Sequence, residues 1–428
     1  MTSKNIITDF CSLDRIEAAT ESINGNIVGY FKGHTLISHF QPIFSIAHRR
    51  PVGYEALLRA KTPAGVNVSP QDIFNLPVCE QETIYLDRLC RNLHLRNFLF
   101  MPNDDIWLFL NINPLVMVKG ALYGPYFSEL LSRYQVPAHR IVVEILEGDI
   151  QDESLLADAA SYYKSLGCLV ALDDFGAGHS NFDRIWRLSP QIVKLDRSII
   201  VQAANNYYAR RVLPNLINLI HESGSLSLME GVETEQEALI AMDSGIDFVQ
   251  GYYFGKPSNL TLSRDLGAAP LPQLCLKFRH FAENEARKYH NKLQNYITIF
   301  QNSAELITSG IAPEEACEAF LVHQETRRCY LLNHDGIQLG INITSPLHNK
   351  SKDDPRFRPI ADTKDANWSR RHYFRRAMSN PGEVQVSRPY LSITGANLCV
   401  TLSIKINSGL NTQIFCCDLD WNEDAVSS

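Results

Sequence analysis

Five short apolar runs in the first two-thirds of the chain each end on a carboxylate or carboxamide side chain. These terminal residues are Glu55, Asn111, Glu144, the adjacent pair Asp173-Asp174, and Glu230. All of them are oxygen donors, and no Cys or His stands at the same positions. Hard divalent cations such as Mg²⁺ and Mn²⁺ prefer oxygen ligands, whereas structural zinc sites use Cys and His. The pattern therefore predicts a magnesium or manganese site, and the acid pair suits two ions that cleave a phosphodiester.

Apolar runs of this length are typical of buried parallel strands, and helical stretches separate most of them. A parallel α/β barrel carries its chemistry at the C-terminal ends of its strands, so these side chains would meet at one mouth. The first strand pair, Phe40–Phe44 and Pro51–Leu57, is joined by a short turn. A parallel crossover needs about a dozen residues, so this pair must be antiparallel. We therefore expect an α/β fold, a TIM-type (β/α)8 barrel with one antiparallel strand.

The chain has 428 residues, which suggests a barrel of roughly 250 residues and a second domain. Its hydrophobic content of 45% and charged content of 20% describe a globular protein. The formal net charge of -7 argues against duplex nucleic acid as a partner. A small phosphate ligand remains compatible with this charge, because it needs only one local cation and a metal ion.

Composition shifts divide the chain into four expected parts. Residues 1–30 form a lead-in, 31–266 the barrel, 267–310 a linker with a connecting helix, and 311–428 an α+β sensor domain. The boundary is marked by the Gly267–Pro272 stretch, and the helix is predicted from aromatic residues at three- and four-residue multiples, such as Tyr289 and Phe300. Antiparallel strands are expected after it, from Cys329 onward.

The ten cysteines are scattered and form no CxxC pair, which favours buried reduced thiols over a disulfide framework. Cys416 and Cys417 are adjacent in an expected strand, so their side chains should point to opposite faces. The first 25 residues carry acids and no apolar core of signal-peptide length. No stretch approaches the roughly 20 apolar residues of a transmembrane segment. A cytoplasmic location is expected.

Eight motifs follow one another between residues 41 and 257. They read Gln41-Pro42-Ile43, Tyr54–Arg59, Asn111–Pro114, Glu144–Glu147, Asp173–Gly178, Lys194–Arg197, Glu230–Thr234 and Val249–Tyr252. Taken singly, several have structural explanations, such as a helix cap at Asp173-Asp174 or a loop at Asn111–Pro114. As an ordered set they resemble the EAL family of cyclic di-GMP phosphodiesterases, over about half the chain. The resemblance implies hydrolysis of cyclic di-GMP to linear pGpG in second-messenger signalling.

The resemblance also implies roles for individual residues. The first ion would be held by Glu55, Asn111, Glu144 and Asp173, and the second by Asp173, Asp174 and Glu230. Lys194 would orient the attacking water or take its proton, and with Asp174 and Glu230 it makes up the expected catalytic set. Two Mg²⁺ or Mn²⁺ ions are expected as cofactors, whereas Ca²⁺ should support binding without cleavage because its shell is larger and looser.

Other residues are assigned to the substrate or to supporting positions by the same resemblance. Arg59 would bind a phosphate through its planar guanidinium group, with Gln41 and Leu57 also contacting the substrate. Gln250 would hydrogen-bond water in the metal shell. Glu147 would hold the loop after Asp174, and Glu233 would support the site from outside.

The sequence departs from the family pattern at two places. His179-Ser180-Asn181 replaces the usual Tyr-Ser-Ser after the glycines, and Asn113 replaces a usual Ser. Both changes leave the charged ligands intact, so they bear on rate and regulation. Two alternatives therefore stand beside the enzyme: a catalytically weak cyclic di-GMP receptor that signals through the C-terminal domain, and a scaffold without nucleotide affinity.

The C-terminal part loosely resembles PAS-like or Cache-like sensor domains. The similarity rests on the Tyr330 strand with its Asp335-Gly336 turn, an expected helix over Trp368–Phe374, and Ser387–Ser392. In such folds a pocket for an unknown small ligand or protein partner would be lined by Trp368, Tyr373, Tyr390 and Asp418. These residues suit an aromatic core equally well. The aromatic stripe of the connecting helix, together with the family resemblance, suggests a homodimer.

Overall fold

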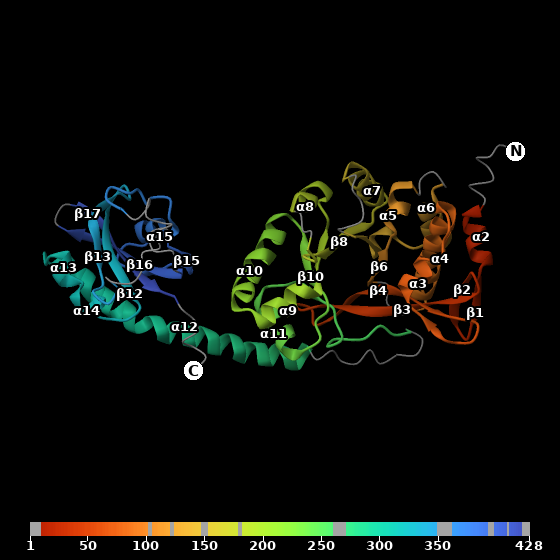
Figure 1. Ribbon diagram of the computed structural model, residues 1–428, viewed down its shortest axis with the longest axis horizontal. Helices are drawn as coiled ribbons and strands as arrows, with labels where there is room; N and C mark the ends of the chain where they lie inside the picture. Colours follow the sequence, from red (N-terminus) through yellow and green to blue (C-terminus); the bar gives the residue numbers. More distant parts are fainter. Residues whose placement is uncertain are drawn as a thin grey trace. The chain divides into compact units, whose positions relative to one another are not determined.

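The computed structural model describes residues 10–101, 105–119, 124–146, 153–178, 182–259, 271–348, 362–392, 398–408 and 411–421. It divides into two compact units, Met1–Ala282 and Glu283–Ser428. Each unit is built around its own β-sheet (Figure 1).

The first unit is a closed barrel of eight strands. They are β3 (His34–Ser45), β4 (Arg50–Lys61), β6 (Trp107–Asn111), β7 (Ile141–Leu146), β8 (Leu169–Phe175), β9 (Ile192–Leu195), β10 (Leu226–Met229) and β11 (Phe248–Val249). Strand β3 runs antiparallel to both of its neighbours, β4 and β11. All other neighbouring barrel strands are parallel. The TIM-type barrel with one reversed strand is therefore confirmed.

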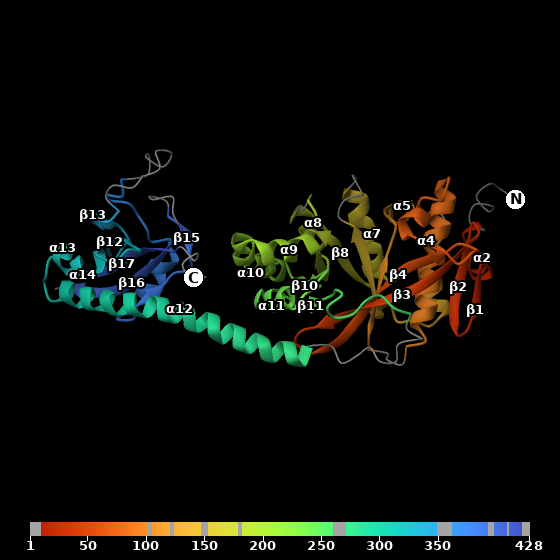
Figure 2. The ribbon, with the colours of Figure 1, turned by 60° about the horizontal axis from the view of Figure 1, so that its bottom comes forward.

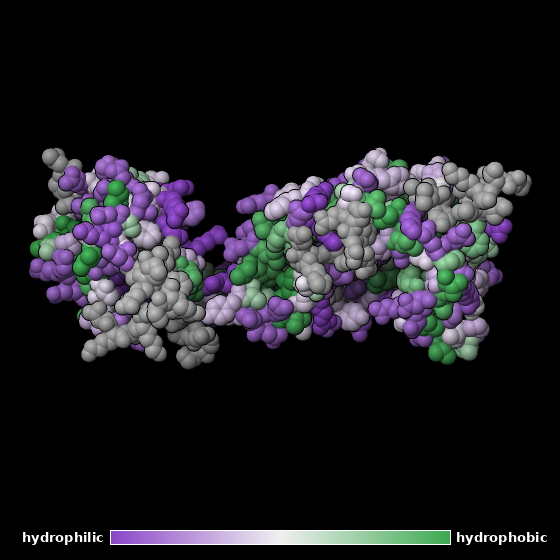
Figure 3. Space-filling model, turned by 45° about the horizontal axis from the view of Figure 1, so that its top comes forward, coloured by the Kyte–Doolittle hydropathy of each residue, from purple (hydrophilic) through white to green (hydrophobic). Residues whose placement is uncertain are grey.

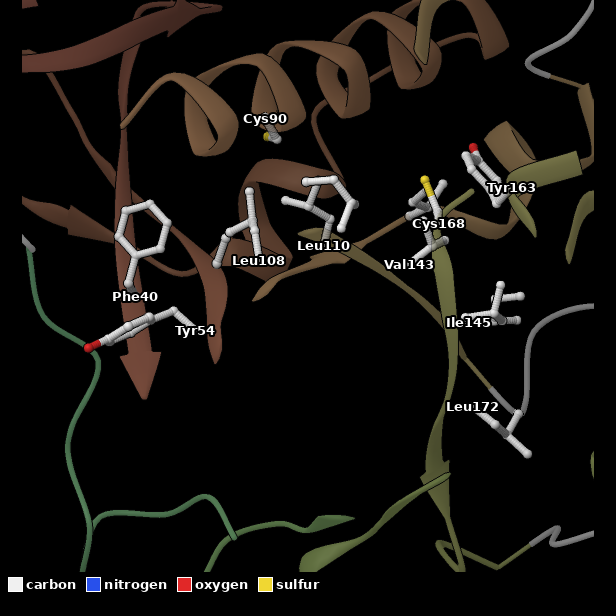
Figure 4. Packing of buried hydrophobic residues seen from close by; sticks show 14 of the residues in the cluster. Phe40, Tyr54, Cys90, Leu108, Leu110, Val143, Ile145, Tyr163, Cys168 and Leu172 are labelled. Carbon is white, nitrogen blue, oxygen red and sulfur yellow. The ribbon is translucent and has the colours of Figure 1, made fainter. Parts of the chain in front are cut away.

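Helices cover the outside of the barrel. They are α4 (Glu80–Phe98), α5 (Pro114–Lys119), α6 (Tyr126–Arg133), the short η2 (Ala138–Arg140), α7 (Glu153–Ser165), α8 (Phe182–Leu188), α9 (Arg197–Asn205), α10 (Tyr207–Glu222) and α11 (Glu235–Asp243). Alternate strand residues point outward against them because side chains alternate along a strand. Figure 4 shows this packing between Leu108 and Leu110 of β6 and the helix that carries Cys90.

The segment expected as a lead-in forms regular structure from Leu13 onward. Helix α2 (Leu13–Ala18) and the antiparallel strands β1 (Thr20–Ile23) and β2 (Asn26–Phe31) extend the sheet beyond β3. On the other edge, β5 (Asn67–Val68) pairs with β4 and is followed by α3 (Pro70–Phe74). The buried residues Leu13 and Ile16 belong to the barrel's outer core, so this segment is part of the unit.

The barrel interior is filled by a layer of apolar side chains. Seven of them form one cluster: Ile43, Phe109, Val142, Ala171, Ile192, Leu228 and Phe248. The remaining barrel strand, β4, contributes Gly53 to this layer. A Cβ atom at Gly53 would lie 2.7 Å from a ring carbon of Phe109. The glycine therefore makes room for the aromatic ring, and the interior is packed rather than open.

The second unit contains an antiparallel sheet in the order β13-β12-β17-β16-β14, with β15 paired to β16. Its strands are β12 (Thr326–Asn333), β13 (Gln338–Thr344), β14 (Gln385–Val386), β15 (Tyr390–Leu391), β16 (Leu398–Ser408) and β17 (Asn411–Asp420). Its helices are the C-terminal part of α12 (Leu271–Thr308), α13 (Pro313–Ala316), α14 (Glu318–Leu321) and α15 (His372–Ser379). In Figure 2, α12 runs alongside the strands of this sheet.

Both faces of this sheet are covered. Cys417 packs with Phe300 and Phe320 on one face, and Cys416 packs with Tyr373 on the other. The expected opposite orientation of the two adjacent cysteines is thus confirmed. All ten cysteines are free thiols, and all except Cys79 and Cys275 are buried.

The connecting helix expected within residues 267–310 is present and spans 38 residues, from Leu271 to Thr308. One expectation for the second unit differs from the structure. The helix expected over Trp368–Phe374 begins only at His372. Trp368 stays outside it because its backbone N–H donates to the Gly336 carbonyl (2.8 Å), which ties it to the turn after β12. Within the part of the chain that is described, no helix is long and apolar enough to cross a membrane.

Candidate metal centre

Each of the eight barrel strands contributes one polar side chain to the same end of the barrel. We call this set the polar ring: Gln41, Glu55, Asn111, Glu144, Asp173, Lys194, Glu230 and Gln250. Every member lies two residues along its strand from a member of the apolar interior layer, so the period of two directs all of them inward. Glu230 and Gln250 immediately follow β10 and β11. The barrel thus brings together the residues singled out at strand ends.

Lys194 lies at the centre of the carboxylates of the polar ring. Its Nζ is 2.5 Å from Glu144, 2.6 Å from Glu230, 2.8 Å from Asp173 and 3.9 Å from Glu55. The Lys194 side chain is only 1% exposed. Burial by itself lowers the pKa of an amine, but the surrounding negative charges outweigh burial and hold the pKa of Lys194 well above its ordinary value. The ammonium group therefore stays charged and holds the carboxylates together.

The pKa values of the surrounding carboxyl groups are raised, because burial disfavours their charged form more than Lys194 favours it. Burial raises the pKa of Glu144 well above its ordinary value, against the lowering effect of Lys194. Burial likewise raises the pKa of Glu230 to about 8 and that of Asp174 to about 6, with the neighbouring Asp173 charge adding to both. The raised pKa values follow because one buried lysine cannot compensate the charges of all the neighbouring acids. Such a site gains from additional cations.

A local irregularity in β8 places both members of the acid pair at the site. Adjacent residues of a regular strand point to opposite faces. The pairing of β8 with β9 shifts between Leu172 and Phe175, and Asp174 has a left-handed φ of 57°. As a result, ligand oxygens of Asp173, Asp174 and Glu230 all lie within 4.8 Å of one another. The same turn contains Gly176. A Cβ atom at this position would lie 2.3 Å from Ile199, so the close approach requires glycine.

The donor set fits divalent cations that prefer oxygen. Asp173, Asp174 and Glu230 form a compact carboxylate cluster. Two buried oxygens, Glu144 Oε2 and Gln250 Oε1, find no hydrogen-bond partner among the described residues. Buried polar atoms are nearly always satisfied, so these orphaned oxygens indicate positions for a ligand that accepts electron pairs. Carboxylate and amide oxygens are the donors that Mg²⁺ and Mn²⁺ prefer.

Gln250 links two other members of the polar ring. Its Nε2 donates to Glu55 Oε2 (2.6 Å) and approaches Gln41 Oε1 (3.2 Å). Gln41 in turn donates to the Gly255 carbonyl (3.1 Å), and Asn111 Nδ2 donates to Glu55 Oε1 (3.1 Å). Both oxygens of Glu55 are therefore fixed by amide donors. Sequence reasoning placed Gln41 and Gln250 at the site without foreseeing that they bond to each other.

Two of the expected substrate-binding residues extend outward from Glu55 along β4. Leu57 and Arg59 follow Glu55 at two-residue intervals, so the three side chains share one face of the strand. Arg59 is partly buried and donates to the Leu58 carbonyl (2.8 Å). Across the β3–β4 pair, His39 lies opposite Leu57, and its pKa is lowered first by burial and then by the Arg59 charge. Sequence reasoning missed this neutral imidazole, for which no motif was available.

The remaining assigned residues lie farther out or outside the described residues. Glu233 forms a bidentate ion pair with Arg197 and has a side chain 34% exposed. It lies beyond the ring, at the loop after β10. Glu147 and the His179-Ser180-Asn181 segment fall outside the described residues. Asn113 is described: its side chain accepts from the Leu115 backbone (2.9 Å), and its own backbone N–H donates to Asp87 (2.9 Å).

In the second unit, the four residues expected to form a sensor pocket do line one cavity. Trp368, Tyr373, Tyr390 and Asp418 surround a volume of about 20 Å³, room for about one water molecule. Asp418 is buried and accepts hydrogen bonds from Arg328 Nε (2.8 Å) and Thr401 Oγ1 (2.7 Å). The rings of Tyr373 and Tyr390 also pack in the core on this face. Trp368, Tyr373 and Tyr390 therefore line the cavity and also belong to the aromatic core on this face of the sheet.

Comparison with known proteins places these features in a family. The profile of the EAL domain family matches residues 26–257, more than half of the chain. An uncharacterized EAL-domain-containing protein of Bacillus subtilis, YkuI, is 27% identical over 354 residues, covering 79% of this chain and 83% of that protein. Its crystal structure, determined in complex with the substrate cyclic di-GMP and calcium, superimposes with a TM-score of 0.76 at 23% identity. The match covers 90% of this chain and 96% of that structure, and shows a shared fold.

Other relatives carry functional names and match only the barrel-sized part of the chain. The cyclic di-GMP phosphodiesterase RocR of Pseudomonas aeruginosa is 27% identical over 51% of this chain and 57% of its own length. The probable cyclic di-GMP phosphodiesterase PdeN of Escherichia coli is 26% identical over 51% of this chain and 42% of its own length. The chain thus spans about half the length of these two relatives.

Proposed function

We propose that this chain, which belongs to the EAL domain family, is a metal-dependent phosphodiesterase that hydrolyses cyclic di-GMP to linear pGpG. One observation carries the proposal: a complete set of carboxylate and amide oxygens surrounds a buried lysine at one end of the barrel. A purely structural cluster has no need for four acids around one cation, because buried carboxylates without compensation are costly. Relatives named as cyclic di-GMP phosphodiesterases support the choice of substrate.

Two Mg²⁺ or Mn²⁺ ions, when bound, would lower the pKa of water and neutralise charge on the phosphate. The first would be held by Glu55, Asn111, Glu144 and Asp173, and the second by Asp173, Asp174 and Glu230. The orphaned oxygen of Glu144 and the close approach of Asp173, Asp174 and Glu230 support this division. Gln250 fixes Glu55 by its hydrogen bond.

The chain's own groups would position the substrate and the attacking water. Arg59 lies on the same strand face as Glu55 and can pair with two phosphate oxygens through its planar guanidinium. Leu57 lies between them and would contact the nucleotide. Lys194 remains protonated among its carboxylates, so it would orient the attacking water and stabilise negative charge rather than act as a base in the resting site.

The test is substitution within the ligand set. Glu55→Ala and Asp174→Ala should each abolish turnover, because each removes a charged donor from one of the two ion positions. Arg133→Ala is the matched control, since it removes an exposed charge of α6 that pairs with Asp14 and Glu17 outside the ring. Turnover at the unaltered rate in both Glu55→Ala and Asp174→Ala would refute the two-metal assignment.

A catalytically weak receptor is the second candidate, and the altered loop at His179-Ser180-Asn181 favours it. Cyclic di-GMP binding in Ca²⁺, followed by product analysis in Mg²⁺ or Mn²⁺, separates the two. Ca²⁺ should support binding and inhibit cleavage, because its larger and looser shell misplaces the reacting groups. Tight binding without product in any of the three metals would establish the receptor.

The second unit is proposed as a sensor that acts on the barrel, within a cytoplasmic homodimer. The shared lining of one cavity by Trp368, Tyr373, Tyr390 and Asp418 supports this role, and a ligand larger than water would have to widen the present volume of about 20 Å³. Exposed apolar side chains on α8 and α10, among them Trp186 (63%) and Tyr208 (67%), support self-association of the barrel. Figure 3 shows apolar residues gathered at this side of the first unit.

A further inference from the structure

A cavity of about 400 Å³ lies on the outside of the barrel, away from the polar ring. It is enclosed by residues of α4, α5, α6 and α7, and α4, α5 and α7 are neighbours in both ribbon views (Figures 1 and 2). Its volume falls within the roughly 300–1,000 Å³ of ordinary small-molecule pockets. No member of the polar ring lines it, so it is a separate site.

The wall combines apolar and aromatic side chains with two buried guanidinium groups and one exposed acid, Asp158. Met117 and Tyr126 contribute apolar surface, while Arg88 and Arg91 enter from α4 with exposures of only 2% and 3%. The guanidinium of Arg91 lies 5.6 Å from the ring centre of Tyr126 and 5.5 Å from that of Phe127. Arginine stacked on aromatic rings recognises planar anions while an apolar body packs beside it.

Arg91 has bonding capacity that its surroundings leave unused. One of its terminal nitrogens pairs with Asp87 at 2.5 Å, but its Nε–H is buried without a hydrogen-bond partner among the described residues. An unsatisfied buried donor on a charged group is costly, and a ligand that accepts from it removes that cost. Arg88 also lines this wall, and its pKa is lowered by burial and then by the Arg91 charge.

We propose that this cavity binds a small amphipathic carboxylate, whose carboxylate accepts from Arg91 and whose apolar body packs among Met117, Tyr126 and Tyr162. A carboxylate suits the site because its two oxygens match the guanidinium fork. The predominance of apolar and aromatic side chains requires an apolar body, which excludes inorganic anions and sugar phosphates as the preferred occupants.

The cavity is connected to the metal centre through one short chain of contacts. Asp87 pairs with Arg91 through one oxygen, and through the other it accepts from the Asn113 backbone (2.9 Å). Asn113 follows Asn111 by two residues, and Asn111 bonds to Glu55 (3.1 Å). A ligand carboxylate competes with Asp87 for Arg91, so occupancy should change how the loop after β6 holds Asn111. This coupling, unlike the cavity itself, rests on the proposed metal site.

The test uses 2-naphthoate as the probe and 2-naphthylmethanol as its neutral counterpart, titrated calorimetrically into the full-length protein without metal or nucleotide. We expect saturable binding of one equivalent of 2-naphthoate. The alcohol should bind roughly tenfold more weakly or worse, because it cannot form the charge-assisted bond. Ala159→Phe fills the cavity from α7 and should remove binding, whereas Ser161→Phe, at an exposed position of the same helix, should preserve it.

Arg91→Lys provides a second variant in case Ala159→Phe fails to fold. It keeps a cation beside Asp87 but lacks the fork, so 2-naphthoate should bind roughly tenfold more weakly. Absence of saturable binding to the unaltered protein overturns the site, as does unchanged 2-naphthoate affinity in folded Ala159→Phe or in Arg91→Lys. In a separate arm, saturating 2-naphthoate should shift Mn²⁺ affinity by about fivefold or more. Unchanged Mn²⁺ affinity overturns the coupling, while no Mn²⁺ binding at all refutes the metal centre and leaves the cavity result standing.

Discussion

The substitution Lys194→Met removes the ammonium group at the centre of the polar ring and keeps most of the side chain's bulk. Lys194 is 1% exposed, and four carboxylates lie within 3.9 Å of its Nζ. Removing one partner of a buried ion pair costs about 3–5 kcal/mol because a charge is left without compensation. A destabilisation of this size corresponds to a fall in Tm of roughly 6–20 °C for a unit of this length. We therefore expect a large loss of stability in the metal-free protein.

This loss should depend on pH and on metal in a particular direction. Without the lysine charge, the pKa values of Glu144 and Glu230 rise further, so the carboxyls can become neutral at low pH. The Tm difference between Lys194→Met and the unaltered protein should thus be large at pH 8 and small at pH 5. Mn²⁺ should restore much of it at pH 8, because the ions replace the missing positive charge.

The assay is thermal denaturation followed by circular dichroism, with chelator or with Mn²⁺, at the two pH values. Lys164→Met is the matched control, because the Lys164 ammonium donates to the carbonyls of Leu188 (2.6 Å) and Ser189 (2.8 Å) and pairs with no acid among the residues that the structure describes. Its effect on Tm should not respond to Mn²⁺. An unchanged Tm for Lys194→Met at pH 8 in chelator would show that the lysine does not hold the carboxylates, and the reasoning would fail.

Three further predictions follow from the same geometry. Arg59→Ala should weaken cyclic di-GMP binding roughly tenfold or more while Mn²⁺ affinity stays constant, and equal nucleotide affinity would remove Arg59 from the site. The folded-state pKa values of Glu230 (about 8) and Asp174 (about 6) exceed the ordinary 4.5 and 3.8. Their contribution to metal-free stability is therefore complete below about pH 4 and lost as pH rises through 8. Mn²⁺ affinity should rise from pH 6 to pH 8 as these carboxyls lose their protons. A Mn²⁺ affinity that does not change with pH would contradict this. Light scattering of the full chain should report a dimer, and a monomer at all concentrations would refute self-association.

The barrel and its reversed strand were predictable because they depend on local features. The short turn between β3 and β4 leaves no room for a crossover, so the antiparallel pair is fixed by chain length alone. Residues at strand ends converge in any parallel barrel, which is why Glu55, Glu144 and Asp173 could be placed together from their positions in the sequence.

Other features depend on contacts between segments that are distant in the chain, and they could not be predicted from the sequence. The left-handed φ of Asp174 arises from a shift in pairing with β9, and no residue type demanded it. The hydrogen bond between Gln41 and Gln250 joins residues far apart in the chain. The sequence around Trp368 predicts a helix that includes this residue. Its backbone N–H donates to the Gly336 carbonyl instead, and the helix begins only at His372. In each case tertiary contacts outweigh local propensity.

Product analysis of cyclic di-GMP incubated with the full-length protein is the most direct test of the central claim. With Mn²⁺ or Mg²⁺, linear pGpG should accumulate as the product, and Asp174→Ala should yield none under the same conditions. In Ca²⁺ the cyclic dinucleotide should bind and remain intact. Recovery of intact cyclic di-GMP after incubation with metal-loaded, nucleotide-bound protein would contradict the account and identify the barrel as a receptor.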